Sequence, residues 1–476
     1  MLTLKKFNLI KKKCDKLIKI TDNLYLVSNN SLNIIKGHPF HLKLFSGSAF
    51  YYFKLFIKNF IKLFISILQN NKTTNGNQKK NLKLLLISNL LNPRCINRND
   101  YVFGNFENEL KKNNISFHKI YINHTIYSNS YIINKIKNKG NLSIIDFNNQ
   151  NIFDNLKCTI KLLGFFILYF LKGVINFDTI NFIFALDFLN NSTKKNLNLF
   201  NNFKKISQNL SYKTLVMPYE GYSWERLILM QSYLQKSEKR IGYHFSGISK
   251  YQHSIFRKLK KKFEPDIIFT TGDYSKKKFK NKINIPVKTF GSVRSFSLKQ
   301  KNIIKKKFDF CILPEGILEE CEKLFLFSLE CANLNPSKSF VWRLHPTMNF
   351  DFVLKKIKVN KSKLPKNIIL SKNNFLKDIS NSKFCIYRGS TSVITAIQAG
   401  VYPIYLNNNE QINIDPIFDF KTWKTILNTS SEFNDFIKYS SKNVSKKTQS
   451  KFKAKKFGEN YFQKMNTKNL IDELKN

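Results

Sequence analysis

The sequence predicts an α/β protein in which two Rossmann-like domains face each other across a cleft. Strand and helix patterns alternate along most of the chain, and such alternation is typical of parallel sheets covered by helices. The alternation stops at a basic stretch, residues 299–307, and then starts again. In both halves, polar side chains follow apolar strands, which is where ligands bind in open α/β sheets.

The first series of elements begins after a polar stretch, Asn70–Lys80, which is typical of a linker. An apolar strand is expected at Lys83–Asn89 and a helix near Tyr101–Lys112. Further strands are expected at Ser116–Ile122, Ser143–Phe147, Asn181–Ala185, Thr214–Met217, Arg240–Phe245 and Asp266–Thr270. These elements define a first domain over residues 81–298, and residues 1–80 form an N-terminal extension.

The second series begins at Phe308–Leu313 and defines a second domain over residues 299–445. Its later elements are expected to be a helix at Leu318–Leu334, strands at Ser339–Trp342, Asn367–Leu370 and Phe384–Tyr387, a helix at Ser392–Ala399, and a strand at Tyr402–Leu406. The last stretch, residues 446–476, is expected to form a helical tail.

The chain carries a formal net charge of +49, from 80 Lys and Arg against 31 Asp and Glu in 476 residues. Clustered basic side chains are typical of nucleic-acid binding, because they neutralise phosphates. Here most of the excess is Lys spread along the whole chain, which fits a general drift in residue usage better than a binding patch. We therefore expect no specific nucleic-acid partner, and an anionic membrane surface is the next partner to consider.

Cysteine usage favours a reducing compartment. The seven cysteines form no Cys-x-x-Cys pair, and Cys311 and Cys385 fall in expected buried strands. This fits the cytoplasm better than a disulfide scaffold. The first twenty residues are interrupted by Lys and lack the apolar core and cleavage site of a signal peptide. A cytoplasmic protein is therefore expected.

Two stretches bear on membrane contact. Leu162–Leu171 is apolar but far shorter than the ~20 residues that a spanning helix needs, so we expect a buried helix of the first domain. Phe50–Leu68 is aromatic and aliphatic, and Lys54, Lys58 and Lys62 lie four residues apart on one helix face. Such a helix fits the membrane interface, and it equally fits a helix packed on its own domain with a solvated Lys stripe.

Side chains suited to anion binding follow two apolar runs of the second half, in Arg343-Leu344-His345-Pro346 and in Arg388-Gly389-Ser390-Thr391-Ser392. Because a residue before proline avoids the helical conformation, His345 should lie just past its strand, where it can bind a phosphate or supply a proton. Gly389 allows a ligand to approach the backbone, and hydroxyl groups at a helix start bind anions. The alternatives are a histidine that caps a turn and ordinary N-capping.

Other strand ends carry further candidates. Glu315, in Pro314-Glu315-Gly316, either binds a ribose or base or faces solvent. In the first half, Glu220 lies on a loop between a strand and a helix, where a carboxylate can take a proton from an acceptor hydroxyl. Trp224 either stacks on a sugar or packs in the helix core. His244 ends the next strand, and it either lies near Glu220 or belongs to the core.

Several signatures of nucleotide and metal sites are missing. There is no Asp-x-Asp triplet, so metal-held binding of a nucleotide diphosphate by two carboxylates is not expected. There is also no Gly-x-x-x-x-Gly-Lys loop and no Gly-x-Gly-x-x-Gly fingerprint. No His and Cys residues have the spacing of a zinc site. We expect no metal and no cofactor besides a nucleotide-linked donor.

The ordered set Glu220-Gly221, His345-Pro346 and Ser390-Thr391-Ser392 resembles the acidic-Gly, His-Pro and Ser-Ser/Thr motifs of bacterial capsule polysialyltransferases and related surface-carbohydrate transferases. The resemblance covers roughly residues 210–405. One departure is Tyr219, which stands where the family often has a second acid.

This resemblance implies a GT-B glycosyltransferase that uses a CMP-activated acidic sugar without a metal. It also implies that Glu220 is the general base, that His345 binds the CMP phosphate, and that the hydroxyl cluster holds the nucleotide. The set of expected substrate-binding residues comprises His244, Trp224, Glu315, Gly316, Arg343, Pro346, Arg388, Gly389, Ser390, Thr391 and Ser392.

The predicted function is transfer of a sialic-acid-like or Kdo-like sugar to a surface polysaccharide or glycolipid, by a cytoplasmic enzyme that lies at the periphery of the inner membrane. One alternative is a CDP-polyol phosphotransferase of the teichoic-acid type, although such enzymes tend to carry a second His-Pro-like site. Another is a non-catalytic basic surface or nucleic-acid-binding protein. Two complete α/β halves and the lack of a concentrated Arg patch argue against that alternative.

Overall fold

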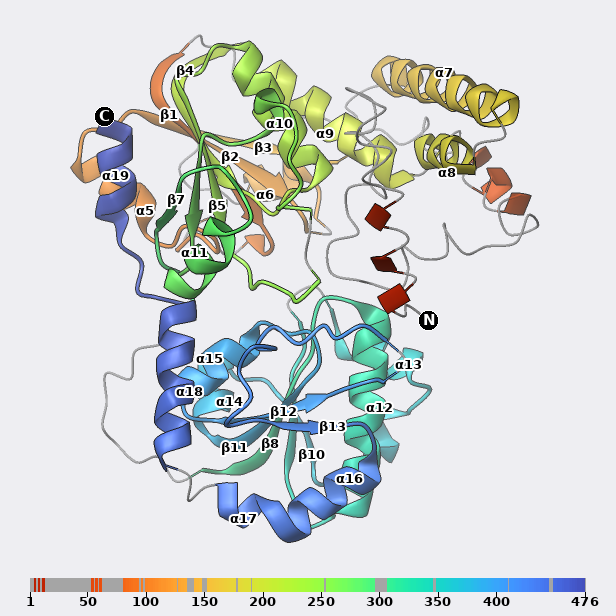
Figure 1. Cartoon of the computed structure of the whole chain (residues 1–476), viewed down its shortest axis with the longest axis vertical. Helices are drawn as coiled ribbons and strands as arrows, with labels where there is room; N and C mark the ends of the chain where they lie inside the picture. Colours follow the sequence, from red (N-terminus) through yellow and green to blue (C-terminus); the bar gives the residue numbers. More distant parts are fainter. Residues whose placement is uncertain are drawn as a thin grey trace.

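The structure, a computed structural model, has two α/β domains that lie one above the other in Figure 1. It describes short pieces within residues 4–12 and 53–61, and then residues 80–93, 96, 99–125, 127–134, 141–147, 152–176, 179–189, 191–251, 254–295, 306–345, 348–409, 411–444 and 448–475. Most of the N-terminal extension, including Lys62 and the expected linker, lies outside the described residues.

The first domain contains a seven-stranded sheet in the order β3-β2-β1-β4-β5-β6-β7, and all neighbouring strands are parallel. The strands are β1 (Lys80–Leu90), β2 (Phe117–Asn123), β3 (Leu142–Ile145), β4 (Leu210–Pro218), β5 (Lys239–His244), β6 (Ile267–Thr270) and β7 (Val287–Thr289). The middle of β1, Leu84–Ile87, is fully buried. Continuous apolar runs of this kind are required where helices cover both faces of a parallel sheet.

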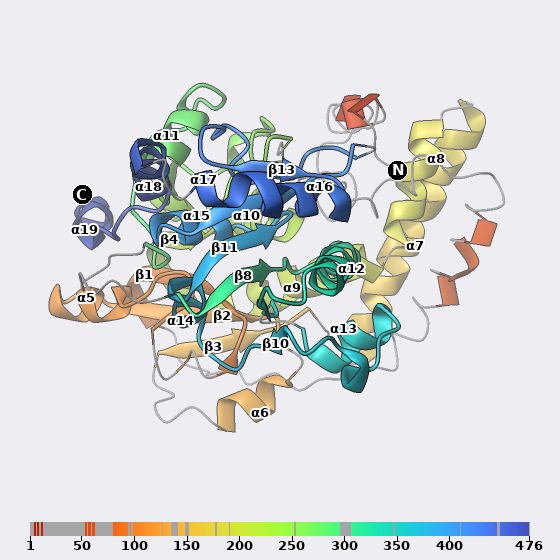
Figure 2. The same cartoon turned by 90° about the horizontal axis from the view of Figure 1, so that it is seen from below.

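Helices of the first domain connect these parallel strands. They are α5 (Phe106–Lys112), α6 (Asn129–Asn134), α7 (Ile152–Ile175), α8 (Thr179–Phe188), α9 (Asn191–Ser207), α10 (Ser223–Leu234) and α11 (Asp273–Lys280), with a short 3-10 helix η3 (Lys261–Phe263). Three of them, α7 to α9, lie in sequence between β3 and β4. Figures 1 and 2 show α7 and α8 at one side of the domain, away from the sheet.

The second domain contains a six-stranded parallel sheet in the order β10-β9-β8-β11-β12-β13. Its strands are β8 (Phe308–Leu313), β9 (Phe340–Trp342), β10 (Ile368–Leu370), β11 (Ser382–Tyr387), β12 (Tyr402–Leu406) and β13 (Thr425–Leu427). Its helices are α12 (Leu318–Leu334), α13 (Phe350–Lys356), α14 (Phe375–Ser380), α15 (Ser392–Gln398), α16 (Ser430–Asp435), α17 (Ser441–Val444) and α18 (Thr448–Tyr461), with η4 (Lys361–Lys363) and η5 (Phe436–Ser440).

The predicted fold class of two Rossmann-like domains is confirmed, but two expectations in the first domain are wrong. Asn181–Ala185 is not a strand and belongs to α8. Leu162–Leu171 lies inside α7, which has 24 residues and exposes much of its apolar surface. Both errors have the same cause, because a short apolar run has no periodicity that separates strand from helix or core from surface.

The C-terminal tail is not one helix. It breaks after α18, and the chain returns to the first domain and forms α19 (Thr467–Lys475), which lies beside α5 (Figure 1). Between the two helices the backbone bonds to the first domain. The N–H of Ser292 donates to the carbonyl of Gln463 at 2.8 Å, and the N–H of Asn466 donates to that of Phe290 at 2.7 Å. The tail therefore ties the two domains together.

We predict that Gly291→Ala destabilises the protein by more than about 1 kcal/mol. Gly291 has a φ of +90°, and a Cβ there would lie within 3.0 Å of the backbone of Lys464 and Met465. The matched control is Gly164→Ala, which is inside α7 with nothing within 4 Å of the new Cβ. Since alanine is the better helix former, the control should unfold at the wild-type temperature or above it. Thermal unfolding followed by circular dichroism measures both, and a wild-type curve for Gly291→Ala would contradict this account of the tail.

Candidate active site

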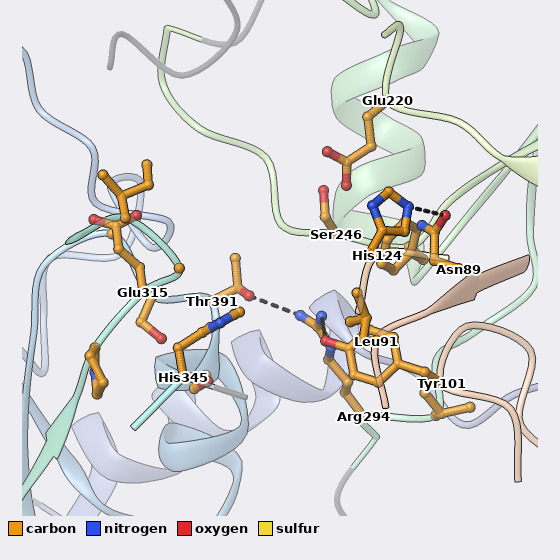
Figure 3. Close-up of a pocket in the computed structure, with 18 of the residues that line it drawn as sticks. Asn89, Leu91, Tyr101, His124, Glu220, Ser246, Arg294, Glu315, His345 and Thr391 are labelled. Atoms are coloured by element: carbon orange, nitrogen blue, oxygen red, sulfur yellow. Dashed lines mark hydrogen bonds between the residues drawn. The ribbon is translucent and has the colours of Figure 1, made fainter. Parts of the chain in front are cut away.

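A cavity of about 1030 Å³ lies between the two domains. Most of its lining residues follow the carboxyl ends of strands of both sheets. The first domain contributes Asn89, Tyr101, His124, Glu220, Tyr222, Trp224, Ser246 and Arg294, and the second contributes Glu315, Gly316, Arg343, His345, Gly389, Ser390, Thr391 and Ser392, among others. Figure 3 shows the two groups on opposite sides. As predicted, residues that follow the carboxyl ends of strands in both domains come together at one cavity.

Glu220 is held on a tight turn between β4 and α10. Its neighbour Gly221 has a φ of +83°, and a Cβ there would lie 2.7 Å from the backbone nitrogen of Ile255. The Glu225 carboxylate accepts hydrogen bonds from the backbone N–H groups of Glu220 and Tyr222, each at 2.8 Å. The turn therefore has little freedom to move, and Glu220 faces the cavity with 4% of its surface exposed.

Two carboxyl groups, Glu220 and Glu225, share this part of the cavity wall. Burial, together with the negative charge of Glu220, raises the pKa of the Glu225 carboxyl well above its usual range. Two carboxylates this close cannot both ionise easily in a buried site. The Glu225 carboxyl therefore keeps its proton to a higher pH than a free glutamate does, and its oxygen holds the backbone of Glu220 in place.

His124 is a cavity residue that the sequence analysis missed. It follows β2, its Nε2 lies 3.1 Å from the Oδ1 of Asn89, and its ring packs 5.2 Å from that of Phe147. The surrounding protein lowers the pKa of His124 below its ordinary value, because the charged ring loses solvation. A neutral imidazole therefore lies on the same side of the cavity as Glu220 at neutral pH (Figure 3).

On the second domain, His345 and Glu315 each pack against a glycine. A Cβ on Gly316 would lie 3.1 Å from the Cε1 of His345. A Cβ on Gly389 would lie within 3.0 Å of both carboxylate oxygens of Glu315. The space above Gly389, which the sequence analysis gave to a ligand, is thus taken by Glu315. Burial and the charge of Arg294 lower the pKa of His345 below its ordinary value.

Arg294 is a second cavity residue that the sequence analysis missed, and it joins the two domains. Its guanidinium donates to the Oγ1 of Thr391 at 2.8 Å and to the hydroxyl of Tyr101 at 2.7 Å. Thr391 is the N-cap residue of α15, yet its side chain makes no capping hydrogen bond. The interpretation of Thr391 as an ordinary N-cap therefore does not describe this side chain. Arg294 supplies a positive charge beside His345 that suits an anion.

Two residues of the expected set do not line the cavity. Arg388 is 2% exposed; its guanidinium pairs with Glu320 and donates to the carbonyl of Leu406 at 3.1 Å. His244 is fully buried, with its ring 5.0 Å from that of Phe279. Side chains alternate between the faces of a strand, so neighbouring positions at a strand end point to opposite sides. We therefore remove Arg388 and His244 from the substrate set.

The other predicted residues lie at the cavity or outside the described chain. Arg343 lines the cavity, but its guanidinium is already paired with Asp378 and donates to the carbonyl of Asn373 at 3.2 Å. Trp224 lines the cavity and stacks on Tyr222 at 6.5 Å. Pro346 lies outside the described residues. Within the described part of the chain, no three His, Cys, Asp or Glu side chains gather where they could hold a metal ion.

Among the solved structures that resemble this chain are an epimerase and a glycosyltransferase. A UDP-GlcNAc 2-epimerase from Neisseria meningitidis, bound to UDP-GlcNAc, matches with a TM-score of 0.50 and 16% identity over 83% of this chain and 100% of that chain. CalG4, the calicheamicin glycosyltransferase, matches with a TM-score of 0.50 and 9% identity over 83% of this chain and 98% of that chain. At such identity the likeness concerns the fold alone, and it supports the GT-B arrangement of two facing α/β domains. No family model and no curated protein matches the sequence.

We predict that Arg294→Gln weakens binding of a nucleoside monophosphate such as CMP by roughly tenfold to a hundredfold. Hydrogen bonds to charged groups contribute about 1.5–3 kcal/mol, and each 1.4 kcal/mol is about tenfold. Titration calorimetry measures the affinity, and Lys277→Gln, an exposed position on α11, is the control. Unchanged affinity in Arg294→Gln would leave this arginine with only a structural role between the domains.

Proposed function

We propose that this protein is a glycosyltransferase that moves a CMP-activated acidic sugar, sialic-acid-like or Kdo-like, onto a surface polysaccharide or glycolipid. The observation that supports this most is that Glu220 lies across one cavity from His345 and Thr391 (Figure 3). These residues belong to the three motifs that resemble those of the capsule polysialyltransferases. They are far apart in sequence, and the fold brings them to one place.

The second domain is suited to hold the donor. A phosphate placed between Arg294 and His345 would receive hydrogen bonds from a guanidinium and an imidazole, with the hydroxyls of Ser390 and Thr391 beside it. Glu315 is a carboxylate acceptor at the same edge, which suits the hydroxyl groups of a ribose. The donor-binding role that we assign to His345, Glu315 and the hydroxyl cluster rests on this arrangement.

The first domain is suited to activate the acceptor. Glu220 takes the proton from an acceptor hydroxyl as the oxygen attacks the anomeric carbon of the donor sugar. A new glycosidic C–O bond forms, the bond between that carbon and the phosphate oxygen breaks, and CMP leaves with the electron pair. No metal is required in this proposal, because Arg294 and His345 face the departing phosphate.

The choice of CMP depends on the motifs and not on the structural neighbours. The Neisseria meningitidis epimerase holds UDP-GlcNAc, but a likeness of fold does not transfer a ligand from one protein to another. A cytoplasmic location remains part of the proposal. The cysteines that the structure describes, among them Cys311 and Cys385, are buried and form no disulfide with one another, which fits the proposed reducing compartment.

We predict that Glu220→Gln lowers turnover about 10²–10⁴-fold, the usual contribution of a general base, and leaves CMP affinity nearly unchanged. The assay supplies CMP-sialic acid and a labelled oligosialic acid, with CMP-Kdo as a second donor, and follows elongation by chromatography. Glu238→Gln is the control, because Glu238 is an exposed carboxylate in a surface ion pair with Lys213. Full activity in Glu220→Gln would move the base elsewhere, and no transfer by the wild type with either donor would contradict the proposed reaction.

We also predict that CMP binds more tightly as the pH falls. In the free protein the pKa of His345 is below its ordinary value, because of burial and Arg294. A bound phosphate offsets the charge of Arg294 and raises that pKa, so binding takes up a proton. Affinity should rise as the pH falls through the pKa of the complex and level off below the pKa of the free protein. CMP itself titrates near pH ~6, so the measurement is the difference in slope between wild type and His345→Gln. Equal slopes would contradict this role of His345.

A further inference from the structure

Helix α7 turns an apolar stripe outward. Among the described residues it is the one helix long and apolar enough to cross a membrane. Only 28% of its most apolar 18-residue stretch is buried in the protein. Its exposed apolar side chains are spaced so that they lie on one face of the helix. They are Phe153, Leu156, Ile160, Ile167, Leu168, Leu171, Val174 and Ile175. Contiguous apolar surface of this kind marks an interaction site.

The opposite face of α7 is part of the protein core. Cys158, Leu162 and Tyr169 are buried in a cluster that includes Phe188 of α8 and Leu197 of α9. Thr159 is also buried on this side, where its hydroxyl accepts a hydrogen bond from Lys194 at 3.2 Å. Helix α7 is therefore held in place by its buried face. Its exposed apolar stripe is not covered by any part of the chain that the structure describes.

The helical residues within 53–61 extend this surface. The ring of Phe56 packs 5.5 Å from that of Phe166 on α7. Phe53, Ile57 and Ile61 are exposed beside it. We call the exposed residues of α7 and of this segment together the α7 surface.

The charge of the α7 surface is positive. Lys157, Lys161 and Lys172 of α7 are exposed, as are Lys54 and Lys58. The one acidic residue of α7, Asp154, pairs with Lys205 of α9. An apolar stripe flanked by solvated lysines is complementary to acyl chains beneath acidic headgroups.

We infer that the α7 surface binds the surface of an anionic lipid bilayer, with α7 lying flat in the interface. A spanning orientation would pull the buried face of α7 out of the core described above. A second copy of the chain is disfavoured as the occupant, because a symmetric contact would set the same lysines against each other. Helix α9, which packs against α7, lines the cavity with Lys195 and Asn196. If the proposed function holds, this contact would bring a lipid-linked acceptor to Glu220.

The test is co-sedimentation of the full chain with vesicles, which requires no activity and so is independent of the proposed reaction. The vesicles contain either phosphatidylcholine alone or phosphatidylcholine mixed with phosphatidylglycerol. The test variant is Ile160→Glu/Ile167→Glu/Leu171→Glu. The matched control is Phe352→Glu/Tyr439→Glu/Phe452→Glu, three exposed apolar positions of the second domain. Circular dichroism melting confirms that both variants are folded.

We expect the wild type and the control to pellet with the mixed vesicles, less at high salt and less with phosphatidylcholine alone. The test variant should pellet at least about tenfold less, since each charge placed in the acyl region is strongly disfavoured. A further variant, Lys157→Glu/Lys161→Glu/Lys172→Glu, should lose the part of the vesicle binding that high salt weakens. Equal pelleting of wild type and test variant, or no pelleting of wild type, would overturn the proposal. Retention of the protein after an alkaline carbonate wash would indicate a spanning helix, and self-association that the test variant abolishes would indicate a second copy; either result would also overturn it.

Discussion

The return of the chain from the second domain to the first is the constraint on which the site depends. The buried hydroxyl of Tyr461, at the end of α18, accepts the backbone N–H of Ile248 at 2.6 Å. Gly272 and Gly291 admit the backbone of residues 460–465 at distances that a side chain would not allow. Each half of the cavity belongs to a different domain. The contacts of residues 460–465 with the first domain therefore decide whether the two sheet edges face each other.

Within that frame, the cavity brings together a carboxyl group, a guanidinium and an imidazole. The Glu220 carboxyl lies on the side of the first domain, where burial together with the charge of Glu220 raises the pKa of the neighbouring Glu225. On the side of the second domain, burial and the positive charge of Arg294 lower the pKa of His345. A neutral hydroxyl and a phosphate are thus suited to opposite sides of the same cavity. Arg294 also contacts both domains through Tyr101 and Thr391, so the anion site and the domain interface share one residue.

The fold and most of the named site residues of the second domain could be predicted from the sequence, because parallel strands leave long apolar runs that end at functional loops. This rule placed Glu220, Glu315 and His345 at the cavity. It would also have found His124, which follows a predicted strand in the same way. Arg294 was missed since it follows β7, a strand of three residues without a clear apolar pattern.

Other features depend on tertiary contacts that no local pattern encodes. The outward stripe of α7 and its buried face both carry apolar side chains, so composition alone could not tell which one meets solvent. The same limit applies to Arg388, whose partner Glu320 lies 68 residues away. It applies also to the break after α18, where contacts with Gly272 and Gly291 decide the path of the backbone.

The central claim is that a cytidine monophosphate unit binds this cavity through a guanidinium, an imidazole and hydroxyls. The most direct measurement is the unfolding temperature with CMP, CDP, UDP and GDP, each in the presence of a chelator and again with Mn²⁺. A ligand that binds the native state raises this temperature. We expect CMP to raise this temperature most, and equally with and without the metal. A shift seen only with UDP or GDP, or only when Mn²⁺ is present, would contradict it.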